Sequence, residues 1–345
     1  MIRRKRAMLL AVFLCSLASG CESLIAAEAE RRFPVEGQMV DVGGGRQIQI
    51  DCRGAGAPTV VFQSGGDMIG SLAWAPVHDR IAEGARTCAY SRAGILWSDP
   101  DEGQFMPEDV ARDLHAALGA AGERPPYVLV AHSRGGLYNL IFAGLYGEEI
   151  AGLVFADASH PDQEAYLSFA GHSTGGYVSA GQEVALALKW TGLMRLSPYP
   201  ADPSIADRVR AFYPKSAQAN AREARRRGET LAVAGKYRDL RNWPVVVLAR
   251  ELPEQTRARE NLDARNAYLL ARDGRDPDLI DAPEDEIVWR RLQANLSTWS
   301  SRGRLEIVPN SNHAFFFFRP DVIVDAVNEV LAATRVVRRE APPAG

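Results

Sequence analysis

The sequence lacks any strong imbalance of charge and any long apolar run. Forty Lys and Arg residues face 43 Asp and Glu residues in a chain of 345, so the protein has no electrostatic reason to prefer nucleic acid. The run Ala7–Ser19 has 13 residues, whereas a transmembrane helix needs about 20. With 46% hydrophobic and 24% charged residues, the composition is that of a soluble protein with a large core. These numbers exclude a disordered chain and a polytopic membrane protein.

Cysteine is scarce, and its placement argues against a zinc site. Of the four cysteines, Cys15 and Cys21 lie near the N-terminus, which leaves Cys52 and Cys88 for the folded part. Neither has a second Cys or a His at the spacing of zinc ligands. The sequence also lacks the Gly-x-x-x-x-Gly-Lys pattern of a phosphate-binding loop. We therefore expect neither a metal nor a nucleotide cofactor.

The N-terminal residues have the pattern of a bacterial export signal, predicted to span residues 1–20. Four positive residues, Arg3–Arg6, precede the apolar run. Ala18-Ser19-Gly20-Cys21 resembles a lipobox, in which Cys21 would be lipidated and attach the protein to the membrane. Cleavage at Ala27-Glu28-Ala29 and an uncleaved anchor are the alternatives. All three place the folded part outside the cytoplasm, in the periplasm or cell envelope, with residues 21–36 as a polar tether.

Apolar runs alternate with helical patterns along the rest of the chain. Short connections between strands and helices predict an α/β fold, with a mostly parallel sheet covered on both faces. The core is expected to comprise residues 37–159 and 243–336. Residues 160–242 carry no strong strand signal, so we expect a helical cap over the carboxyl edge of the sheet. Expected strands are Gln47–Cys52, Thr59–Gln63, Thr87–Tyr90, Tyr127–Ala131, Leu153–Ala156, Val245–Ala249 and Leu305–Val308; expected helices include Pro107–Ala120, Ile287–Trp299 and Pro320–Ala333.

One short segment has the pattern of a catalytic nucleophile. His132-Ser133-Arg134-Gly135-Gly136 follows a buried strand and precedes a helix, which is the context of a Gly-x-Ser-x-Gly turn with Ala131 in the first glycine position. Small residues on both sides of the serine allow the strand to turn sharply into the helix. The positive end of that helix stabilises negative charge near the serine oxygen. The alternative is a serine in a tight turn without chemistry.

A serine hydroxyl needs a base and an acid to become a nucleophile. His313 lies after the last predicted strand, in the chain order Ser, acid, His, and is the predicted base; His160 is a weaker alternative. Asp157 ends the strand Leu153–Ala156 at the carboxyl edge of the sheet, so it is the predicted acid. Glu251, which follows the strand Val245–Ala249, is the alternative acid.

Two backbone N–H groups are required to stabilise the oxyanion that forms during acyl transfer. Arg134 directly follows the serine and is expected to supply one. The other is expected from Gly66, because Ser64-Gly65-Gly66-Asp67 follows a buried strand and lets the backbone approach closely.

Five stretches together resemble the α/β-hydrolase family, specifically the bacterial serine hydrolases with a helical cap. The resemblance covers most of residues 47–335. It implies an eight-stranded sheet, a Ser–acid–His triad, no cofactor and hydrolysis of a small-molecule carboxylic ester. The stretches are Asp51–Gly54 through Pro58, Cys88–Gly94 with Trp97-Ser98-Asp99, Tyr127–Gly136, Asp157–Gln163, and His313 before Arg319-Pro320-Asp321.

The resemblance also implies that the strands of Cys52 and Cys88 are neighbours, and we expect a disulfide between them. The chain departs from similar proteins in having Ala131 for Gly, Ser91 for Asp, and Ser64-Gly65 for His-Gly or Ala-Gly. The resemblance leaves the substrate open. Hydrolysis of an amide or C–C bond, and a non-catalytic lipid-anchored binding protein on the same scaffold, are the alternatives.

Two further segments have alternative interpretations. Phe315–Phe318 follows His313 closely and would either line an apolar acyl pocket or pack under the last helix. The run Arg222–Arg227 would either contact an anionic membrane face or form the solvated face of a helix, as such runs more often do.

Overall fold

The computed structural model describes residues 27–167, 178, 180–188, 203–251 and 284–340. The predicted signal and Cys21 with its lipobox lie outside the described residues. Within the described residues, no helix combines the length and the hydropathy that a membrane crossing requires.

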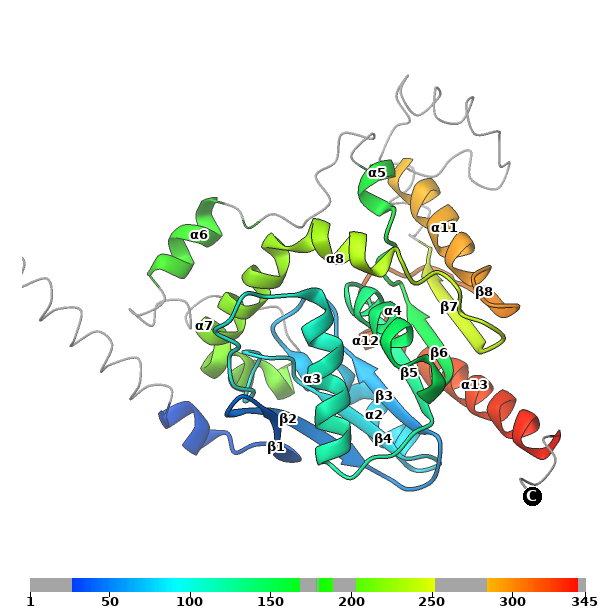
Figure 1. Cartoon of the computed structure of the whole chain (residues 1–345). Helices are drawn as coiled ribbons and strands as arrows, with labels where there is room; N and C mark the ends of the chain where they lie inside the picture. Colours follow the sequence, from blue (N-terminus) through cyan, green and yellow to red (C-terminus); the bar gives the residue numbers. More distant parts are fainter. Residues whose placement is uncertain (1–26, 168–177, 179, 189–202, 252–283, 341–345) are drawn as a thin grey trace, which may run out of the picture.

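A single eight-stranded sheet organises the molecule (Figure 1). The strand order is β1-β2-β4-β3-β5-β6-β7-β8. Strands β1 and β2 form the antiparallel edge, and β4, β3 and β5 to β8 run parallel to one another. The strands are β1 Gln38–Gly43, β2 Arg46–Arg53, β3 Thr59–Gln63, β4 Thr87–Tyr90, β5 Tyr127–His132, β6 Ile150–Ala156, β7 Pro244–Arg250 and β8 Arg302–Val308. The predicted α/β fold and its sheet are confirmed.

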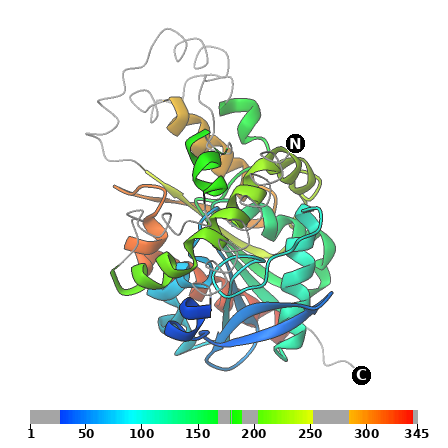
Figure 2. The same cartoon turned by 90° about the vertical axis from the view of Figure 1, so that its left-hand side faces the viewer.

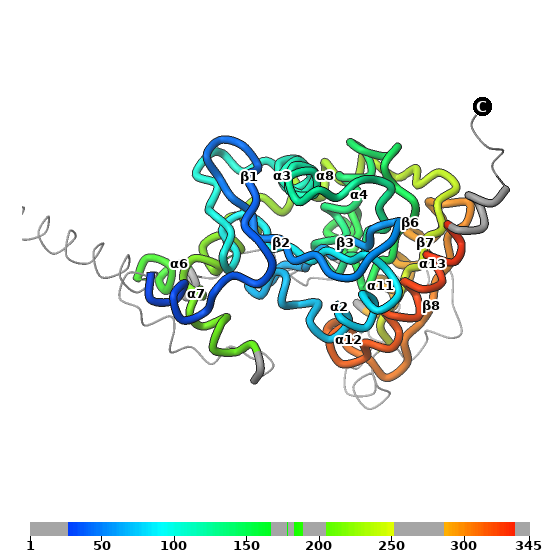
Figure 3. Tube along the Cα trace, turned by 90° about the horizontal axis from the view of Figure 1, so that it is seen from below, coloured from blue at the N-terminus to red at the C-terminus, as the bar shows by residue number. Residues whose placement is uncertain are grey.

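The buried strands divide their side chains between two cores, because successive residues of a strand point to opposite faces. Val60 and Phe62 of β3 pack in one cluster, whereas Val61 between them packs in the other. Helices α3 Pro107–Ala120, α4 Gly135–Leu145 and α8 Arg227–Ala234 cover the face of Val61. Helices α2 Ala75–Ala82, α12 Phe315–Phe318 and α13 Pro320–Glu340 cover the opposite face, and Figure 3 shows these two layers from below.

Strand β1 is absent from the sequence-based prediction. It pairs with β2 at the outer edge of the sheet, and only Val40 among its residues is buried. A half-exposed edge strand of six residues carries little apolar signal. The clearer sign is the run Gly43-Gly44-Gly45, in which all three residues have positive φ. This conformation, which glycine adopts readily, marks the hairpin turn into β2.

The predicted disulfide between Cys52 and Cys88 is present. Cys52 of β2 and Cys88 of β4 are register partners in the antiparallel pair, with their Cα atoms 4.1 Å apart. The disulfide therefore fastens the antiparallel edge to the parallel part of the sheet. Glu123 lies close to both sulfur atoms, but bonded sulfurs are not available as thiolate ligands, so this group among the described residues offers no metal site.

The chain between β6 and β7 contains several helices, as expected for residues 160–242, which we call the cap segment. They are α5 Gln163–Leu167, α6 Ala180–Ala187, α7 Pro203–Arg225 and α8. The arginines at the end of α7 are paired within the protein: Arg222 with Asp101, Arg225 with Glu183, Arg226 with Glu229 and Arg227 with Glu164. These pairs agree with a helix face that is satisfied internally and give no support to a membrane-binding patch.

Residues 27–36, part of the expected tether, pack against the folded body. Residues 27–32 are helical, and Ala29 is buried. The indole N–H of Trp97 donates a hydrogen bond to the carbonyl of Phe33 at 2.9 Å, and Glu36 forms an ion pair with Arg208 of α7. Figures 1 and 2 show this arm lying beside α7. The arm is thus a packed part of the structure rather than a free polar linker.

Candidate active site

Ser133 stands at a sharp turn between β5 and α4. Its φ is +52°, a left-handed conformation that costs a non-glycine residue energy and often occurs at functional sites. The glycines after it are required by close packing. A Cβ on Gly135 would lie 2.6 Å from the carbonyl oxygen of Ser64, and one on Gly136 would lie 2.5 Å from the Cβ of Ala158. The turn therefore has the geometry that its sequence predicts.

The structure brings Ser133, His313 and Asp157 into one chain of hydrogen bonds. The hydroxyl of Ser133 lies 2.9 Å from Nε2 of His313, and Nδ1 of the same ring lies 2.5 Å from Oδ2 of Asp157. His313 comes from the loop after β8, and Asp157 follows the last residue of β6. Both ring nitrogens of His313 are thereby engaged, one by a hydroxyl and one by a carboxylate.

Asp157 is fully buried, yet it is held as a carboxylate. Burial opposes its charge, but hydrogen bonding to His313 and the positive charge of Arg250 outweigh burial and lower the pKa of Asp157 well below its usual range. Arg250 donates to Oδ2 at 2.6 Å, and the indole N–H of Trp289 donates to Oδ1 at 2.5 Å. The backbone N–H of Arg250 also donates to Oδ1, at 3.2 Å.

Arg250 and Trp289 do not appear among the residues inferred from sequence. Arg250 ends β7 at the same sheet edge as Asp157, so its position could have indicated a partner. Trp289 lies in helix α11, Glu284–Ser297. It is separated from Asp157 by 132 residues, and no local pattern links the two.

Glu251, the alternative acid, has other partners. Its carboxylate accepts a hydrogen bond from Arg290 at 2.7 Å. Its backbone carbonyl accepts one from the N–H of Ser311 at 2.7 Å, and its backbone N–H donates to Val308 at 3.1 Å. The backbone of Glu251 therefore holds the loop that carries His313, while the carboxylate of Asp157 binds the imidazole ring.

His160, the alternative base, is a buried neutral side chain. Desolvation lowers its pKa to about 4. Its Nδ1 accepts a hydrogen bond from the backbone N–H of Asp162 at 3.1 Å, and its Nε2 donates to Asn295 at 3.2 Å. Nε2 thus joins the start of the cap segment to α11, and Nδ1 holds the turn of the chain at Asp162.

His132 takes part in the site in a way that the sequence does not reveal. Its Nε2–H donates to the backbone carbonyl of His313 at 2.8 Å, and its ring stacks on Phe316 with centroids 3.9 Å apart. Desolvation, together with the neighbouring His313, lowers its pKa to about 3, so the ring stays neutral. His132 therefore supports the backbone of the residue whose ring contacts Ser133.

For Phe315–Phe318, the sequence left two interpretations open: lining of an apolar acyl pocket, or packing under the last helix. Phe315 and Phe316 are buried in the core between α2 and α13, in agreement with packing under the last helix. Phe317 is partly buried, and Phe318 is 70% exposed. The first two residues of this run therefore do not line an open pocket.

The two expected oxyanion donors lie on either side of Ser133. Arg134 precedes α4, whose positive end stabilises negative charge. Gly65 lies so close to the serine that a Cβ on it would be 3.1 Å from the Cβ of Ser133, and Gly66 follows directly. No described residue accepts a hydrogen bond from the backbone N–H of Gly66 or of Arg134.

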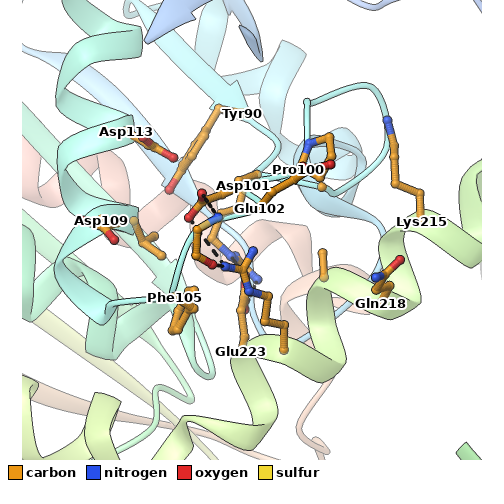
Figure 4. A pocket seen from close by; sticks show the side chains of 17 residues that line it. Tyr90, Pro100, Asp101, Glu102, Phe105, Asp109, Asp113, Lys215, Gln218 and Glu223 are labelled. Atoms are coloured by element: carbon orange, nitrogen blue, oxygen red, sulfur yellow. Dashed lines mark hydrogen bonds and ion pairs between the residues drawn. The ribbon is translucent and has the colours of Figure 1, made fainter. Parts of the chain in front are cut away.

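A cavity of about 580 Å³ lies beside this site, between α3 and α7. Figure 4 shows Asp109 and Asp113 reaching it from α3, and Lys215 and Gln218 from α7. Neither Ser133, His313 nor Asp157 lines it. Its wall includes Arg92, which donates a hydrogen bond to Ser64 in the loop beside Ser133, and Glu223, which accepts a hydrogen bond from Arg92.

The sequence matches the model of a protein family described as "Alpha/beta hydrolase family" over residues 54–326. The chain belongs to the alpha/beta hydrolase family. It is therefore an enzyme with the hydrolase fold, and the match spans both halves of the sheet and the cap segment between them.

Individual relatives of this hydrolase are distant. A curated protein of Hormonema carpetanum, named "Probable transporter efuK", is 24% identical over 85% of the chain. The chain spans 42% of that protein's length, and no more than 43% of the length of three further curated relatives.

Solved structures resemble the hydrolase over nearly their whole length. A thermophilic esterase from Thermogutta terrifontis is 16% identical, with a TM-score of 0.55 over 86% of this chain and 98% of that one. A serine hydrolase involved in carbazole degradation is 15% identical, with a TM-score of 0.53 over 86% of this chain and 98% of that one. At these identities the likeness shows the fold alone.

Proposed function

We propose that the protein hydrolyses carboxylic esters of small molecules, with Ser133 as nucleophile, His313 as base and Asp157 as the acid that orients the imidazole. The observation that supports this proposal is the continuous chain of hydrogen bonds from Ser133 Oγ through His313 to Asp157. A hydroxyl within 3 Å of an imidazole that is itself held by a buried carboxylate is the arrangement that activates a serine.

In the first half of the reaction, Ser133 Oγ attacks the ester carbonyl carbon and its proton passes to Nε2 of His313. The carbonyl oxygen becomes an oxyanion, and the N–H groups of Gly66 and Arg134 donate to it. The negative charge of Asp157 stabilises the imidazolium. When the tetrahedral intermediate collapses, the alcohol leaves with the proton from His313, and the acyl group remains on Ser133.

In the second half, a water molecule takes the place of the alcohol. His313 removes a proton from the water as it attacks the acyl carbon, and the same two N–H groups hold the second oxyanion. Collapse releases the carboxylic acid and returns the proton to Ser133. No cofactor is required by these steps.

We also propose that the enzyme works outside the cytoplasm. The disulfide between Cys52 and Cys88 supports this location, because disulfides persist in oxidising compartments and are rare in the cytosol. The export signal and the lipid on Cys21 are the sequence expectations that accompany it. Labelling of free thiols in the unreduced protein tests whether the disulfide is formed. Two reactive thiols, at Cys52 and Cys88, would contradict it.

A panel of chromogenic esters of rising acyl length tests the proposed reaction. We expect turnover by the wild type and a loss of at least about 10³-fold in kcat for Ser133→Ala, because the nucleophile is gone while substrate binding and the oxyanion donors remain. The matched control is Ser301→Ala, an exposed serine beyond α11. Equal turnover by wild type and Ser133→Ala would discard the mechanism, and cleavage of amides in preference to esters would discard the substrate class.

A further inference from the structure

Three charged side chains from separate parts of the chain meet behind the loop that carries Gly66. Arg92 follows β4, Arg134 follows Ser133, and Glu223 lies in α7. Arg92 donates from Nε and Nη2 to the two carboxylate oxygens of Glu223 at 2.8 and 3.0 Å. Arg134 donates to the same carboxylate at 3.0 Å. Arg92 and Glu223 are each only 3% exposed.

Arg92 also holds the backbone of the loop after β3. Its Nη1 donates to the carbonyl of Ser64 at 2.7 Å and to the Ser64 hydroxyl at 2.9 Å, and its Nη2 donates to the carbonyl of Gly65 at 2.7 Å. One planar guanidinium thus bridges the carboxylate of α7 and two consecutive carbonyl groups. A lysine has a single point of charge and cannot make this set of contacts.

The hydrogen bond to the Gly65 carbonyl determines the direction of the next N–H. The Gly65–Gly66 peptide is not among the cis bonds of the described chain, and a trans peptide directs its C=O and N–H to opposite sides. Because the Gly65 carbonyl points at Arg92, the N–H of Gly66 points away from Arg92. The loop also lies close to Ser133, because a Cβ on Gly65 would be 3.1 Å from the Cβ of Ser133.

Arg134 constrains Gly66 from a second direction. A Cβ on Gly66 would lie 2.7 Å from Nη2 and 2.8 Å from Cζ of Arg134, so the guanidinium packs flat on this glycine. The guanidinium is fixed in turn by Asn220 and Glu223, both in α7, at 3.0 Å each. Helix α7 of the cap segment is therefore connected to Gly66 through both arginines.

The charges of this cluster stabilise one another. Desolvation opposes the charge of Glu223, but the two guanidinium groups lower its pKa below the ordinary value. Asp67, which directly follows Gly66, lies close to the same cluster, and burial raises the pKa of its carboxyl although Arg92 opposes this effect.

We propose that Arg92 and Glu223 are positioning residues for the oxyanion-binding N–H groups of Gly66 and Arg134. Through Glu223, the cap segment sets the geometry in which Ser133 reacts. This inference rests on the proposed esterase mechanism, and it adds that the cap segment assists the chemical step as well as covering the sheet edge. Figure 4 shows Glu223 on α7 at the wall of the neighbouring cavity. There it forms an ion pair with Arg92.

Kinetics of two conservative variants test the inference, with a matched ion pair elsewhere as control. Arg92→Lys keeps the charge but not the bridge, and Glu223→Gln keeps the shape but not the charge. The control is Arg86→Lys, because Arg86 holds Glu123 by two hydrogen bonds of 3.0 and 2.6 Å at the opposite, amino end of the strands. Thermal unfolding of all four proteins is measured alongside.

We expect kcat for the best ester to fall about 10- to 100-fold in Arg92→Lys and Glu223→Gln, somewhat less than the loss of a whole oxyanion donor. KM should stay within about 3-fold, because the ground-state ester makes little use of the donors. Arg86→Lys should keep kcat within about 2-fold, because the pair of Arg86 and Glu123 lies at the far end of the strands. If Glu223→Gln does not fold, the kinetics of Arg92→Lys alone test the positioning role.

A pair of inhibitors provides a readout that a purely structural role would not change. A trifluoromethyl ketone forms a tetrahedral adduct: a bond forms between Ser133 Oγ and the carbonyl carbon, the serine proton moves to His313, and the ketone oxygen becomes an oxyanion. The corresponding methyl ketone binds largely without forming this adduct. In Arg92→Lys we expect the inhibition constant of the trifluoromethyl ketone to rise about 10- to 100-fold, in step with the loss of kcat, and that of the methyl ketone to stay unchanged.

The outcomes separate this inference from the proposed function. If Ser133→Ala retains the wild-type activity, both are overturned. If activity depends on Ser133 but Arg92→Lys keeps the wild-type kcat and inhibitor ratio, only the positioning role is overturned. If kcat falls equally in Arg86→Lys and Arg92→Lys, the loss follows general stability and the positioning role is likewise rejected.

Discussion

The two sides of Ser133 are held by different parts of the chain. On the acid–base side, Asp157 is held by Arg250 at the end of β7 and by Trp289 of α11, so the hydrolase core supplies every contact. On the oxyanion side, the loop before Gly66 is held by Arg92, which is in turn held by Glu223 of the cap segment. In the proposed mechanism, the core therefore positions the proton transfer, and the cap segment contributes to positioning the charge.

This difference suggests how such a fold can change without losing its chemistry. Contacts within the parallel sheet are fixed by strand register and by packing on both faces, so the acid–base side tolerates little variation. A cap segment connected to the site through Glu223 and Asn220 can vary elsewhere in sequence while keeping these contacts. The three predictions that follow test each side separately.

The largest effect is expected on the acid–base side. Asp157→Asn should lower kcat about 10⁴-fold, because an amide cannot stabilise the imidazolium and leaves His313 in the wrong tautomer. Glu251→Gln, in the alternative acid, should lower kcat less than about 10-fold, because Glu251 acts through Arg290 and the loop backbone. Steady-state kinetics on one ester compares the two. A larger loss in Glu251→Gln would reverse the assignment of the acid.

A smaller effect is expected from crowding the oxyanion side. Gly66→Ala places a methyl group against the guanidinium of Arg134, which Asn220 and Glu223 keep from moving away. We expect kcat to fall about 10²- to 10³-fold with KM nearly constant, since one donor is displaced. Gly119→Ala in α3, where a Cβ meets nothing within 4 Å, serves as the control and should leave kcat unchanged. Unaltered kcat in Gly66→Ala would remove Gly66 from the oxyanion site.

The smallest effect concerns stability against acid, which should distinguish the two sides. His132, on the acid–base side, has a folded pKa of about 3, whereas unfolded histidine has one near 6.5. The unfolded chain therefore binds a proton first, and this contribution to stability is full above pH 6.5 and is lost as the pH falls toward 3. Glu223, on the oxyanion side, has a lowered pKa, so its contribution is lost only below about pH 4.5.

Urea unfolding of wild type and His132→Asn at several pH values tests this difference. Between pH 6 and pH 5 the free energy of unfolding of the wild type should fall relative to the variant by about 1 kcal/mol, because up to one proton is taken up on unfolding. The other buried histidines, His78 and His160, are present in both proteins and cancel in the comparison. Parallel pH profiles would show that His132 is not held neutral.

Much of the fold follows from local patterns in the sequence. The runs Thr59–Gln63 and Thr87–Tyr90 coincide with β3 and β4, because a strand buried on both faces is mostly apolar along its length rather than alternating. The apolar pattern does not predict strand β1, because this strand lies at the sheet edge and has only one buried residue. No local pattern predicts the packing of the arm around Ala29 and Phe33 either, because its partners on α7 are more than 170 residues away in the sequence.

For the candidate site, the sequence indicates the reactive residues but not their supports. Ser133 is marked by the small residues that its turn requires, and His313 by its place after the last strand. The choice between Asp157 and Glu251 stays open in the sequence, because both follow strands that end at the same sheet edge. In the structure, Asp157 lies at Nδ1 of His313, whereas the carboxylate of Glu251 accepts a hydrogen bond from Arg290.

The sequence alone determined the alternation of strands and helices and the turn at Ser133, since each depends on residue spacing. The disulfide partners followed from the family resemblance of the sequence, which implies neighbouring strands for Cys52 and Cys88. Only the tertiary structure decided that Arg250 and Trp289 hold Asp157, that His132 supports His313, and that Glu223 reaches the loop of Gly66 through Arg92. These contacts join residues 90 to 180 positions apart. These contacts depend on how the helices pack on the sheet, and residue spacing along the chain does not predict that packing.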